Sequence, residues 1–301
     1  MKKIKSLLAL VLALCFLVPT LLLVACKTDS PTLDGSLSTE ESIEDESSED
    51  SSSSAPDTSV DSSAQSKPTP PKEDSSSSSS SAPAPTPPKT DNAEYIRLTG
   101  NNVNIRKGAG TSSTALGSAE KGTVYALIGK TGNWYKTYYK NQTAYIYAEY
   151  ASVFTLEKND EADVESVIEE GYKLLGVPYV YGAVRFHDGT GKLLGGFSAQ
   201  KFDCSSLVQY VFYKGAGVKL GTHTRAQVKQ GKFVKRADIQ RGDCIYFTNE
   251  ERQYNTGVER VGHVAIYLGN DYILHTSSDY ARIEKLTAKR WSYYIETRRF
   301  L

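Results

Sequence analysis

Cysteine is scarce in this sequence, whose 301 residues contain four: Cys15, Cys26, Cys204 and Cys244. Cys204 has no cysteine or histidine two to four residues away, the spacing that usually marks a zinc site, so we expect no metal and no cofactor. The first two cysteines fall in an N-terminal apolar run. A disulfide within the folded part would therefore have to join Cys204 to Cys244. Against that bridge, Cys244 belongs to a short alternating stretch in which cysteine acts as a small core residue.

The sequence also lacks a net charge, but its charges are unevenly distributed. Residues 27–92 hold 14 acidic and 4 basic residues, a net charge of −10, whereas residues 93–301 hold 21 acidic and 28 basic residues, a net charge of +7. The C-terminal part is therefore modestly basic, which suits an anionic surface such as a cell wall. Its basic residues form no tight cluster, so we expect no nucleic-acid partner.

Residues 27–92 have almost no large apolar side chain and are rich in serine, proline, aspartate and glutamate. Such a segment buries too little surface to offset the entropy of ordering, so we expect it to be disordered. As a flexible coil its two ends would lie about 45 Å apart. We interpret this segment as a linker that tethers the folded part to whatever precedes it.

Residues 1–26 begin Met-Lys-Lys-Ile-Lys and continue as an apolar run, the pattern of an export signal. The run ends in Leu-Val-Ala-Cys, which resembles a bacterial lipobox. The resemblance implies cleavage before Cys26, lipid attached to its sulfur, and an extracytoplasmic protein anchored in the cell membrane and facing the cell wall. The alternative is a plain secretory signal or an uncleaved anchor, since the run is close to the shortest length that spans a membrane.

Residues 93–155 contain short, closely spaced strand patterns separated by turns, which favours a small all-β barrel. The segment resembles the bacterial SH3-like domain in its Asn-Ile-Arg-Lys-Gly-Ala-Gly start, its Asn-Trp-Tyr-Lys strand and its Ala-Tyr-Ile closing strand. The resemblance implies wall binding, or the positioning of substrate beside a catalytic domain. Five tyrosines are candidates for a stacking surface, with at least half of them expected in the core instead: Tyr135, Tyr138, Tyr139, Tyr145 and Tyr147.

Residues 156–301 are predicted to form an α+β domain, with helices first and antiparallel strands after them. One helix is expected over Asp163–Leu175, because its apolar residues recur at helical spacing, and a second is expected to start at Cys204. A capping box at Thr224–Gln227 predicts a short third helix. Strands are expected near Asp243, His263, Tyr272 and Arg282 and over Tyr294–Arg298.

Cys204 is the candidate nucleophile of this domain. Asp203 is a good N-cap residue and apolar residues follow at helical spacing, so Cys204 is expected in the first turn of its helix. Unsatisfied backbone N–H groups and the helix dipole favour the thiolate there, and the thiolate is the nucleophilic form of cysteine. The alternative is a buried core thiol.

The candidate base lies on a predicted hairpin. His263 begins one strand, His275 ends the returning strand, and the turn signal Asn270-Asp271 lies between them. A two-residue turn that pairs Gly269 with Tyr272 would place the two histidines on opposite faces of the sheet. A three-residue loop, or a bulge with the same effect, would place them on one face, as joint action on Cys204 requires.

These segments together resemble the NlpC-type cell-wall endopeptidases, which have a papain-like fold of helices packed on an antiparallel sheet. The resemblance implies that Cys204 is the nucleophile, His263 the base, His275 the residue that orients the base, and Tyr179 a residue that positions the nucleophile or stabilises the oxyanion. Three further residues are candidates for contact with the peptide stem: Asp203, Ser205 and His223. The segments that carry the resemblance are residues 176–182, 202–209, 240–243 and 262–269, followed by His275.

The sequence departs from that family at three places. Ala183 and Ser206 stand where the family usually has glycine, and residues 184–201 form a longer connection with four glycines. A loop of this composition next to the nucleophile is expected to cover the cleft and to alter specificity. His187, which lies in this insert, is expected to be a solvated loop residue.

We therefore expect a monomeric, lipid-anchored cysteine peptidase that acts on peptidoglycan stem peptides through a thioester. The resemblance further implies cleavage between γ-D-glutamate and the diamino acid. The first alternative is an amidase or acyltransferase of the same fold. The second is a wall-binding lipoprotein whose catalytic domain is inactive.

Overall fold

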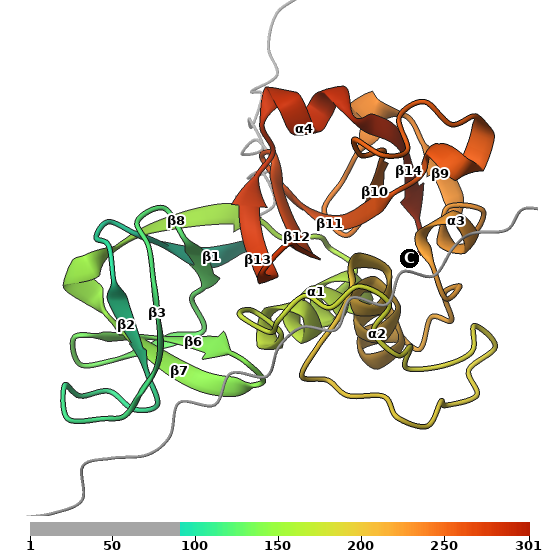
Figure 1. Cartoon of the computed structure of the whole chain (residues 1–301). Coiled ribbons are helices and arrows are strands. Elements are labelled where there is room, and N and C mark those ends of the chain that lie inside the picture. Colours follow the sequence, from blue (N-terminus) through green and yellow to red (C-terminus); the bar gives the residue numbers. More distant parts are fainter. Residues whose placement is uncertain (1–90) are drawn as a thin grey trace, which may run out of the picture. The chain divides into compact units, whose positions relative to one another are not determined.

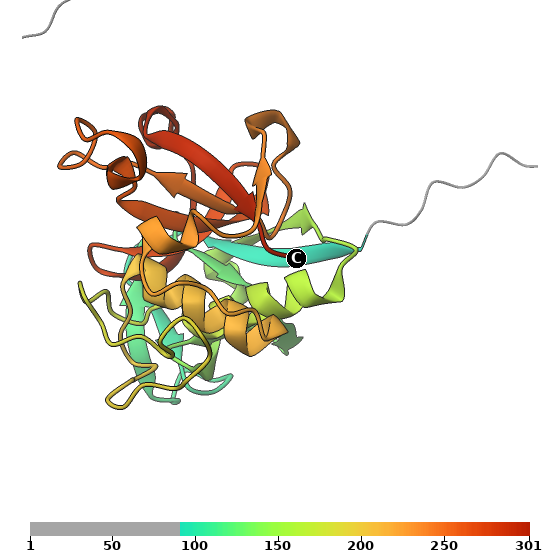
Figure 2. The same cartoon turned by 90° about the vertical axis from the view of Figure 1, so that its right-hand side faces the viewer.

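The computed structural model describes residues 91–301, and the structural statements below refer to that part of the chain. The predicted signal segment, Cys26 and all but the last two residues of the predicted tether lie outside it. None of the helices it contains is long and apolar enough to cross a membrane. Figure 1 and Figure 2 present these elements in two views.

Residues 92–157 form strands, as the sequence predicted. Strands β8, β1 and β4 are neighbours in one sheet, and the remaining five make a second sheet in the order β3-β2-β7-β6-β5. The two sheets contribute to one core, in which Ile96, Ile105 and Ile146 are fully buried. The strands are β1 (Asn92–Leu98), β2 (Val103–Arg106), β3 (Ala115–Ala119), β4 (Val124–Ala126), β5 (Gly129–Thr131), β6 (Trp134–Tyr139), β7 (Gln142–Tyr147) and β8 (Ala151–Glu157).

The C-terminal half combines helices with an antiparallel sheet, which confirms the expected mixture of helix and sheet. Its helices are α1 (Ala162–Lys173), α2 (Cys204–Ala216), α3 (Thr224–Gln227) and α4 (Ala288–Ser292). Its strands are β9 (Lys232–Val234), β10 (Cys244–Phe247), β11 (His263–Gly269), β12 (Tyr272–Ser277), β13 (Tyr280–Lys285) and β14 (Tyr294–Arg299). Single-turn helices at residues 148–150, 236–238 and 257–260 complete the described elements.

The two halves share one nine-stranded sheet, in the order β8-β1-β4-β13-β12-β11-β10-β14-β9. The junction is narrow, because Val124 of β4 pairs with Ile283 of β13 and no second pair joins these strands. A buried side chain reinforces it: Arg241 donates hydrogen bonds to the hydroxyl groups of Tyr95 at 2.8 Å and Tyr172 at 3.0 Å. The sequence had indicated two separate domains and gave no sign of this shared sheet.

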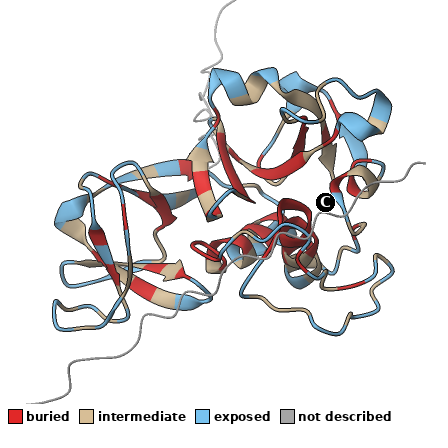
Figure 3. Cartoon of the chain, viewed as in Figure 1, coloured by how far each residue is buried: buried red, intermediate tan, exposed pale blue. Residues whose placement is uncertain are grey.

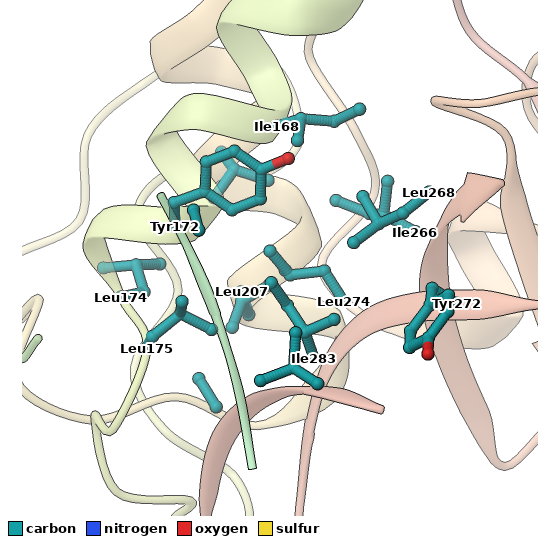
Figure 4. Close-up of a cluster of buried hydrophobic side chains, with 14 of the residues drawn as sticks. Ile168, Tyr172, Leu174, Leu175, Leu207, Ile266, Leu268, Tyr272, Leu274 and Ile283 are labelled. Carbon is teal, nitrogen blue, oxygen red and sulfur yellow. The ribbon is translucent and has the colours of Figure 1, made fainter. Parts of the chain in front are cut away.

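Helices α1 and α2 pack side by side against the sheet (Figure 1). The inner face of α1 buries Val164, Val167 and Ile168, as the apolar spacing predicted. Leu207 of α2 meets Leu274 of β12 in the same apolar cluster (Figure 4). Almost the whole first half of α2 is buried, as Figure 3 shows, so the helix that begins at Cys204 is held rigidly.

The short helix α3 begins one residue earlier than the capping box predicted. Thr224 is its first residue rather than its cap. His223 caps it instead, because its Nδ1 accepts a hydrogen bond from the Ala226 backbone N–H at 3.2 Å. The ring of His223 is otherwise exposed.

The insert at residues 184–201 packs on the side of α2. The ring of Phe186 lies 5.2 Å from Tyr210 and 5.3 Å from Tyr213, and Phe197 stacks on Tyr210 at 5.3 Å. These aromatic contacts fix a loop whose glycines alone would leave it free.

His187 was expected to be solvated, and that prediction is wrong. The residue is fully buried within the insert, and its ring lies 5.0 Å from that of Tyr213. The backbone N–H of Gly189 donates to its Nδ1 at 3.0 Å, so the local turn folds back over the imidazole. The loop thus has a small core of its own, which composition alone did not indicate.

The five tyrosines singled out in residues 93–155 divide between core and surface. Tyr139 is buried, and Tyr135 and Tyr138 are half-buried against the same core. Tyr147 contacts the ring of Trp134 at 5.2 Å and lines a surface pocket. The expectation that at least half of the five belong to the core is confirmed by Tyr135, Tyr138 and Tyr139, and Tyr147 remains a candidate for a stacking surface.

Candidate active site

The helix α2 starts at Cys204 because Asp203 caps it. Asp203 Oδ1 accepts the Ser206 backbone N–H at 2.8 Å, and Ser206 Oγ accepts the Asp203 backbone N–H at 2.9 Å. These reciprocal bonds form a capping box. The predicted cap and the place of Cys204 in the first turn are confirmed, and the serine that departs from the expected glycine supplies half of the cap.

The carboxylate of Asp203 is buried and satisfied from several sides. Arg185 Nη1 lies 2.8 Å from its Oδ2, and the Gly182 backbone N–H donates to the same oxygen at 3.2 Å. Ser205 Oγ donates to Asp203 Oδ1 at 3.1 Å and accepts from Arg185 Nη2 at 3.3 Å. Because a buried charge is tolerated only when it is paired, this network fixes the start of the helix and with it the direction of the Cys204 side chain.

The thiol of Cys204 is 8% exposed. Burial raises its pKa to about 12, and the charge of Asp203 adds to the rise, although the backbone N–H groups of Val264 and Ser205 act in the opposite direction. At neutral pH Cys204 is therefore a thiol in the free protein. The sequence predicted a thiolate here, but burial outweighs the field of the helix start. Cys204 and Cys244 are both free cysteines.

A bulge in the predicted hairpin brings the two histidines together. Asn270 and Asp271, with φ of 48° and 65°, form a two-residue turn between β11 and β12. The pairing register then shifts next to the turn, and Leu268 is left without a partner. Because side chains alternate along a strand, this one-residue shift puts His263 and His275 on the same face of the sheet. The second of the two predicted geometries is the one observed.

The two imidazoles are in direct contact, and a carboxylate lies behind them. His263 Nε2 is 2.9 Å from His275 Nδ1, and the rings are nearly perpendicular. His275 Nε2 lies 3.1 Å from Glu284 Oε1. This second contact is off the line of an ideal N–H···O bond, so its main effect is electrostatic. Arg290 Nη2 donates to the same Glu284 oxygen at 3.3 Å and holds the carboxylate in place.

Burial sets the charges of this chain of residues. It lowers the pKa of His263 well below its usual range, and His275 and Arg290 add to the drop. Burial also lowers the pKa of His275, although Glu284 partly offsets it. Burial alone would raise the pKa of Glu284, but the contact with His275 and the charge of Arg290 lower it to about 2. At neutral pH both rings are neutral and the carboxylate is charged.

Cys204 and His263 line one pocket of about 590 Å³, together with Tyr179. The backbone of Tyr179 bridges to Phe202, two residues before the cysteine, and its N–H donates to the Asp279 carbonyl at 2.9 Å. Burial raises the pKa of Tyr179 to about 12, with Cys204 adding to the rise. The phenol therefore stays protonated and can donate a hydrogen bond into the pocket.

Two segments of this chain match the models of known protein families. Residues 176–299 match the model of the NlpC/P60 family, and residues 101–152 match that of the bacterial SH3 domain. The first match contains Cys204, His263 and His275, and it also contains Glu284, for which the sequence analysis assigned no role.

Several characterised hydrolases are similar to this chain. It is 36% identical over 126 residues to the gamma-DL-glutamyl hydrolase of Bacillus subtilis, which covers 42% of this chain and 25% of the relative. It is 28% identical over 171 residues to the gamma-D-glutamyl-L-lysine dipeptidyl-peptidase of the same organism, covering 57% and 50%. It is 33% identical over 132 residues to the peptidoglycan DL-endopeptidase CwlO of Bacillus licheniformis, covering 43% and 25%. The chain thus spans a quarter to a half of the length of these relatives.

The candidate site residues lie at different places around the pocket. Tyr179, Cys204 and His263 line the pocket, and His275 lies directly behind His263. Asp203 and Ser205 are buried on either side of Cys204 in the sequence, and His223 caps α3. None of the three is among the residues that line the pocket, so their contact with substrate stays a prediction.

The insert does not cover the cleft. No residue of the described range 184–201 lines the pocket that holds Cys204. Its link to the site is indirect, because Arg185 pairs with Asp203 at the start of α2. The expected cover over the nucleophile is therefore wrong, since the aromatic residues of the loop hold it against the side of the helix.

Glu284 is the residue that sequence reasoning missed. It lies on β13, whose His275–Arg282 pairing with β12 places Glu284 one alternation further along the strand. Recognising it requires that the register of two consecutive hairpins be known, including the bulge at Leu268. In the sequence, Glu284 is a glutamate at alternate spacing in a short predicted strand. Glutamates are common at such positions on solvent-facing strands, so this pattern did not mark Glu284 as a site residue.

Proposed function

We propose that this chain is a cell-wall hydrolase, a cysteine endopeptidase that cleaves peptidoglycan stem peptides between γ-D-glutamate and the diamino acid. The observation that carries the proposal is the arrangement of Cys204 and His263 in one pocket, with His275 at 2.9 Å and Glu284 behind it. A nucleophile, a base, and groups that orient the base are the parts that covalent amide hydrolysis requires.

The tautomers follow from the contacts. A carboxylate only accepts hydrogen bonds, so we assign the proton of His275 to Nε2, the nitrogen that faces Glu284. Its Nδ1 is then an acceptor, and His263 Nε2–H donates to it. This leaves Nδ1 of His263 without a proton and free to accept one. The chain Glu284–His275–His263 thus prepares the base.

The reaction then begins from a neutral pair. As Cys204 Sγ attacks the carbonyl carbon of the scissile amide, its proton moves to His263 Nδ1, so no thiolate is needed in the resting state. In this proposal the developing oxyanion accepts hydrogen bonds from the backbone N–H of Cys204, at the start of α2, and from the hydroxyl of Tyr179, which lines the same pocket. The charge of Glu284 stabilises the imidazolium that forms.

The second half of the cycle returns the proton. The His263 imidazolium protonates the leaving amine, the C–N bond breaks, and a thioester between Cys204 and the γ-carbonyl remains. Water, deprotonated by the now neutral His263, attacks the thioester, and the proton goes back to the departing sulfur. The products are a free γ-carboxylate and a free amine on the diamino acid.

The choice of bond rests on the relatives. One is named a gamma-D-glutamyl-L-lysine dipeptidyl-peptidase and another a peptidoglycan DL-endopeptidase. The first name gives a γ-D-glutamyl-L-lysine bond and the second gives peptidoglycan as the substrate, and we combine the two in this proposal. The intact set of Cys204, His263 and His275 favours catalysis over mere binding.

We propose that the segment that matches the bacterial SH3 domain binds the cell wall. It carries a pocket of about 600 Å³ in which Trp134, Tyr147 and Tyr150 lie beside Asn104 and Arg106. Aromatic faces next to amide and guanidinium groups suit the apolar, acetamido and carboxylate parts of peptidoglycan. Lipid attachment at Cys26 and an extracytoplasmic location are also proposed, and they rest on the N-terminal sequence pattern and its resemblance to a lipobox. The proposal is completed by the expected monomeric state.

Purified muropeptides digested with the protein test this function. Mass spectrometry should find a new amine on the diamino acid with the wild type, and Cys204→Ala should lower the rate by roughly three or more orders of magnitude. The matched control is Cys244→Ala, which removes the other thiol and should retain activity. Sugar freed from the peptide would instead mean an amidase, and unchanged muropeptides with retained wall binding would mean a binding protein.

A further inference from the structure

Two opposite charges line the same pocket as Cys204 and are not used in the mechanism above. Glu250 follows β10 and Lys289 lies on α4, and Lys289 Nζ is 3.1 Å from Glu250 Oε1. The two side chains come from segments 39 residues apart in sequence. They therefore meet because both line this pocket, not because of local backbone geometry.

The ion pair is a poor structural element. Both side chains are 73% exposed, and ion pairs that are so exposed to solvent contribute little to stability. Arg290, the next residue of α4, differs in this respect because its charge is committed to Glu284. Lys289 and Glu250 thus hold charges that can change partners at little cost, at the edge of a site where a peptide is to bind.

The proposed substrate carries matching charges. In a γ-linked D-glutamyl peptide the α-carboxylate stays free on the acyl side of the scissile amide. On the amine side, a diamino acid such as lysine places an ammonium group at the end of its side chain. A pocket that binds this zwitterionic segment has to satisfy one charge of each sign.

We propose that Lys289 binds the free carboxylate on the acyl side of the scissile amide and that Glu250 binds the ammonium group of the diamino acid. The inference rests on the proposed function and deepens it, because it names the residues that determine specificity. Substrate binding exchanges the Lys289–Glu250 pair for two intermolecular pairs, so the number of ionic contacts rises from one to two. Glu251, which also lines the pocket, adds a second negative charge to it.

Three synthetic peptides test the pairing: L-Ala-γ-D-Glu-L-Lys, the same peptide with the glutamate carboxylate amidated, and the same peptide with the lysine side chain acetylated. We expect the wild type to prefer the doubly charged peptide by about three- to ten-fold in kcat/KM over each neutralised one, which is the range of an exposed ion pair. Lys289→Met should abolish the first preference alone, and Glu250→Gln the second alone.

The decisive control keeps the ion pair and reverses it. The double variant Glu250→Lys with Lys289→Glu retains the contact, and unfolding should be unchanged, but the signs facing the substrate are swapped. If the pair only supports the fold, this variant keeps the wild-type preferences and overturns the inference. If the two charges bind the substrate as proposed, both preferences disappear or reverse.

Failure of the inference can be told apart from failure of the proposed function. If the wild type and every variant cleave all three peptides at equal rates, the protein does not recognise the substrate charges. The inference is then wrong, but the proposed endopeptidase activity is confirmed. If the wild type cleaves none of them and no muropeptide, the proposed function and this inference fall together.

Discussion

His275 Nδ1 lies 2.9 Å from His263 Nε2, and this contact exists because the hairpin that joins them contains a bulge at Leu268. Without the extra residue the two rings would point to opposite faces of the sheet. With it, His263, which lines one pocket with Cys204, contacts a second imidazole that is backed by Glu284. A single backbone irregularity therefore decides whether this domain has an oriented base.

Glu284→Gln should lower kcat by about ten-fold, because the amide cannot stabilise the imidazolium that forms on His263 as a carboxylate does. The acid limb of the kcat/KM profile should move to lower pH. The sign follows from charge: Glu284 favours protonated imidazole, so its removal lowers the pKa of the histidine pair and lets His263 stay neutral in more acidic solution. Rates measured between pH 4 and 8 check both effects.

Glu296→Gln is the matched control for that variant. Glu296 lies on β14 and is paired with Arg298 at 2.6 Å, so it loses the same charge in an ion pair away from the histidines. We expect its pH profile to equal that of the wild type. An unmoved acid limb in Glu284→Gln would mean that the carboxylate serves the fold alone.

Alkylation of Cys204 by iodoacetamide should accelerate with pH up to at least pH 10 without reaching a plateau. The reason is that burial raises the thiol pKa to about 12, and the thiolate is the form that reacts. The measurement is made in the Cys244→Ala background so that one thiol is followed. A plateau below pH 7 would instead indicate a preformed thiolate–imidazolium pair and would contradict the neutral starting state.

Much of this arrangement could be predicted from the sequence, and the reasons are local. Asp203, Cys204 and the apolar residues that follow specify a capped helix within a few residues, so its start was predicted correctly. The hairpin of His263 and His275 was also predicted, because turn residues and alternation are short-range signals. For the same reason the sequence offered two registers and could not choose between them.

What was missed depends on contacts between distant segments. The pairing of Val124 with Ile283 and the contact of Glu284 with His275 are set by how whole strands align. The protonation state of the Cys204 thiol depends on its burial. Burial cannot be predicted from the few residues that specify the start of the helix. His187 was misplaced because the glycine-rich composition of its loop concealed an aromatic core around Phe186.

Stability should fall as the pH drops from 6.5 to 4.5. Burial lowers the pKa of His263 and His275, so in this window the unfolded chain binds more protons than the folded one, and acidification favours unfolding. The loss is at most about 1.4 kcal/mol per pH unit for each histidine. Well above pH 6.5, the ordinary pKa of histidine, this contribution is complete and constant. Urea midpoints across the range measure it.

The histidines and Glu284 lose their stabilising contributions in different pH ranges. The pKa of that carboxyl falls from 4.5 to about 2 on folding, so its stabilising contribution is lost only below pH 4.5. His275→Asn should therefore flatten the slope between pH 6.5 and 4.5 and leave the steeper loss below it less affected. A wild-type midpoint that does not change over this window would show that the rings are protonated in the folded protein.

Gly215→Ala should destabilise the protein by about 1 to 3 kcal/mol, although alanine is the better helix former by about 1 kcal/mol. Gly215 lies inside α2, and a Cβ there would stand 2.5 Å from the backbone N and Cα of Val167 on α1. Backbone cannot turn aside as a side chain can, so the helices must separate, and the packing penalty exceeds the gain in propensity. The control is Gly195→Ala, in the insert, where a Cβ meets nothing within 4 Å. Thermal unfolding of both variants decides the sign: a Gly215→Ala protein as stable as the wild type would mean that α1 and α2 adjust freely, and that the position of Cys204 does not depend on their close approach.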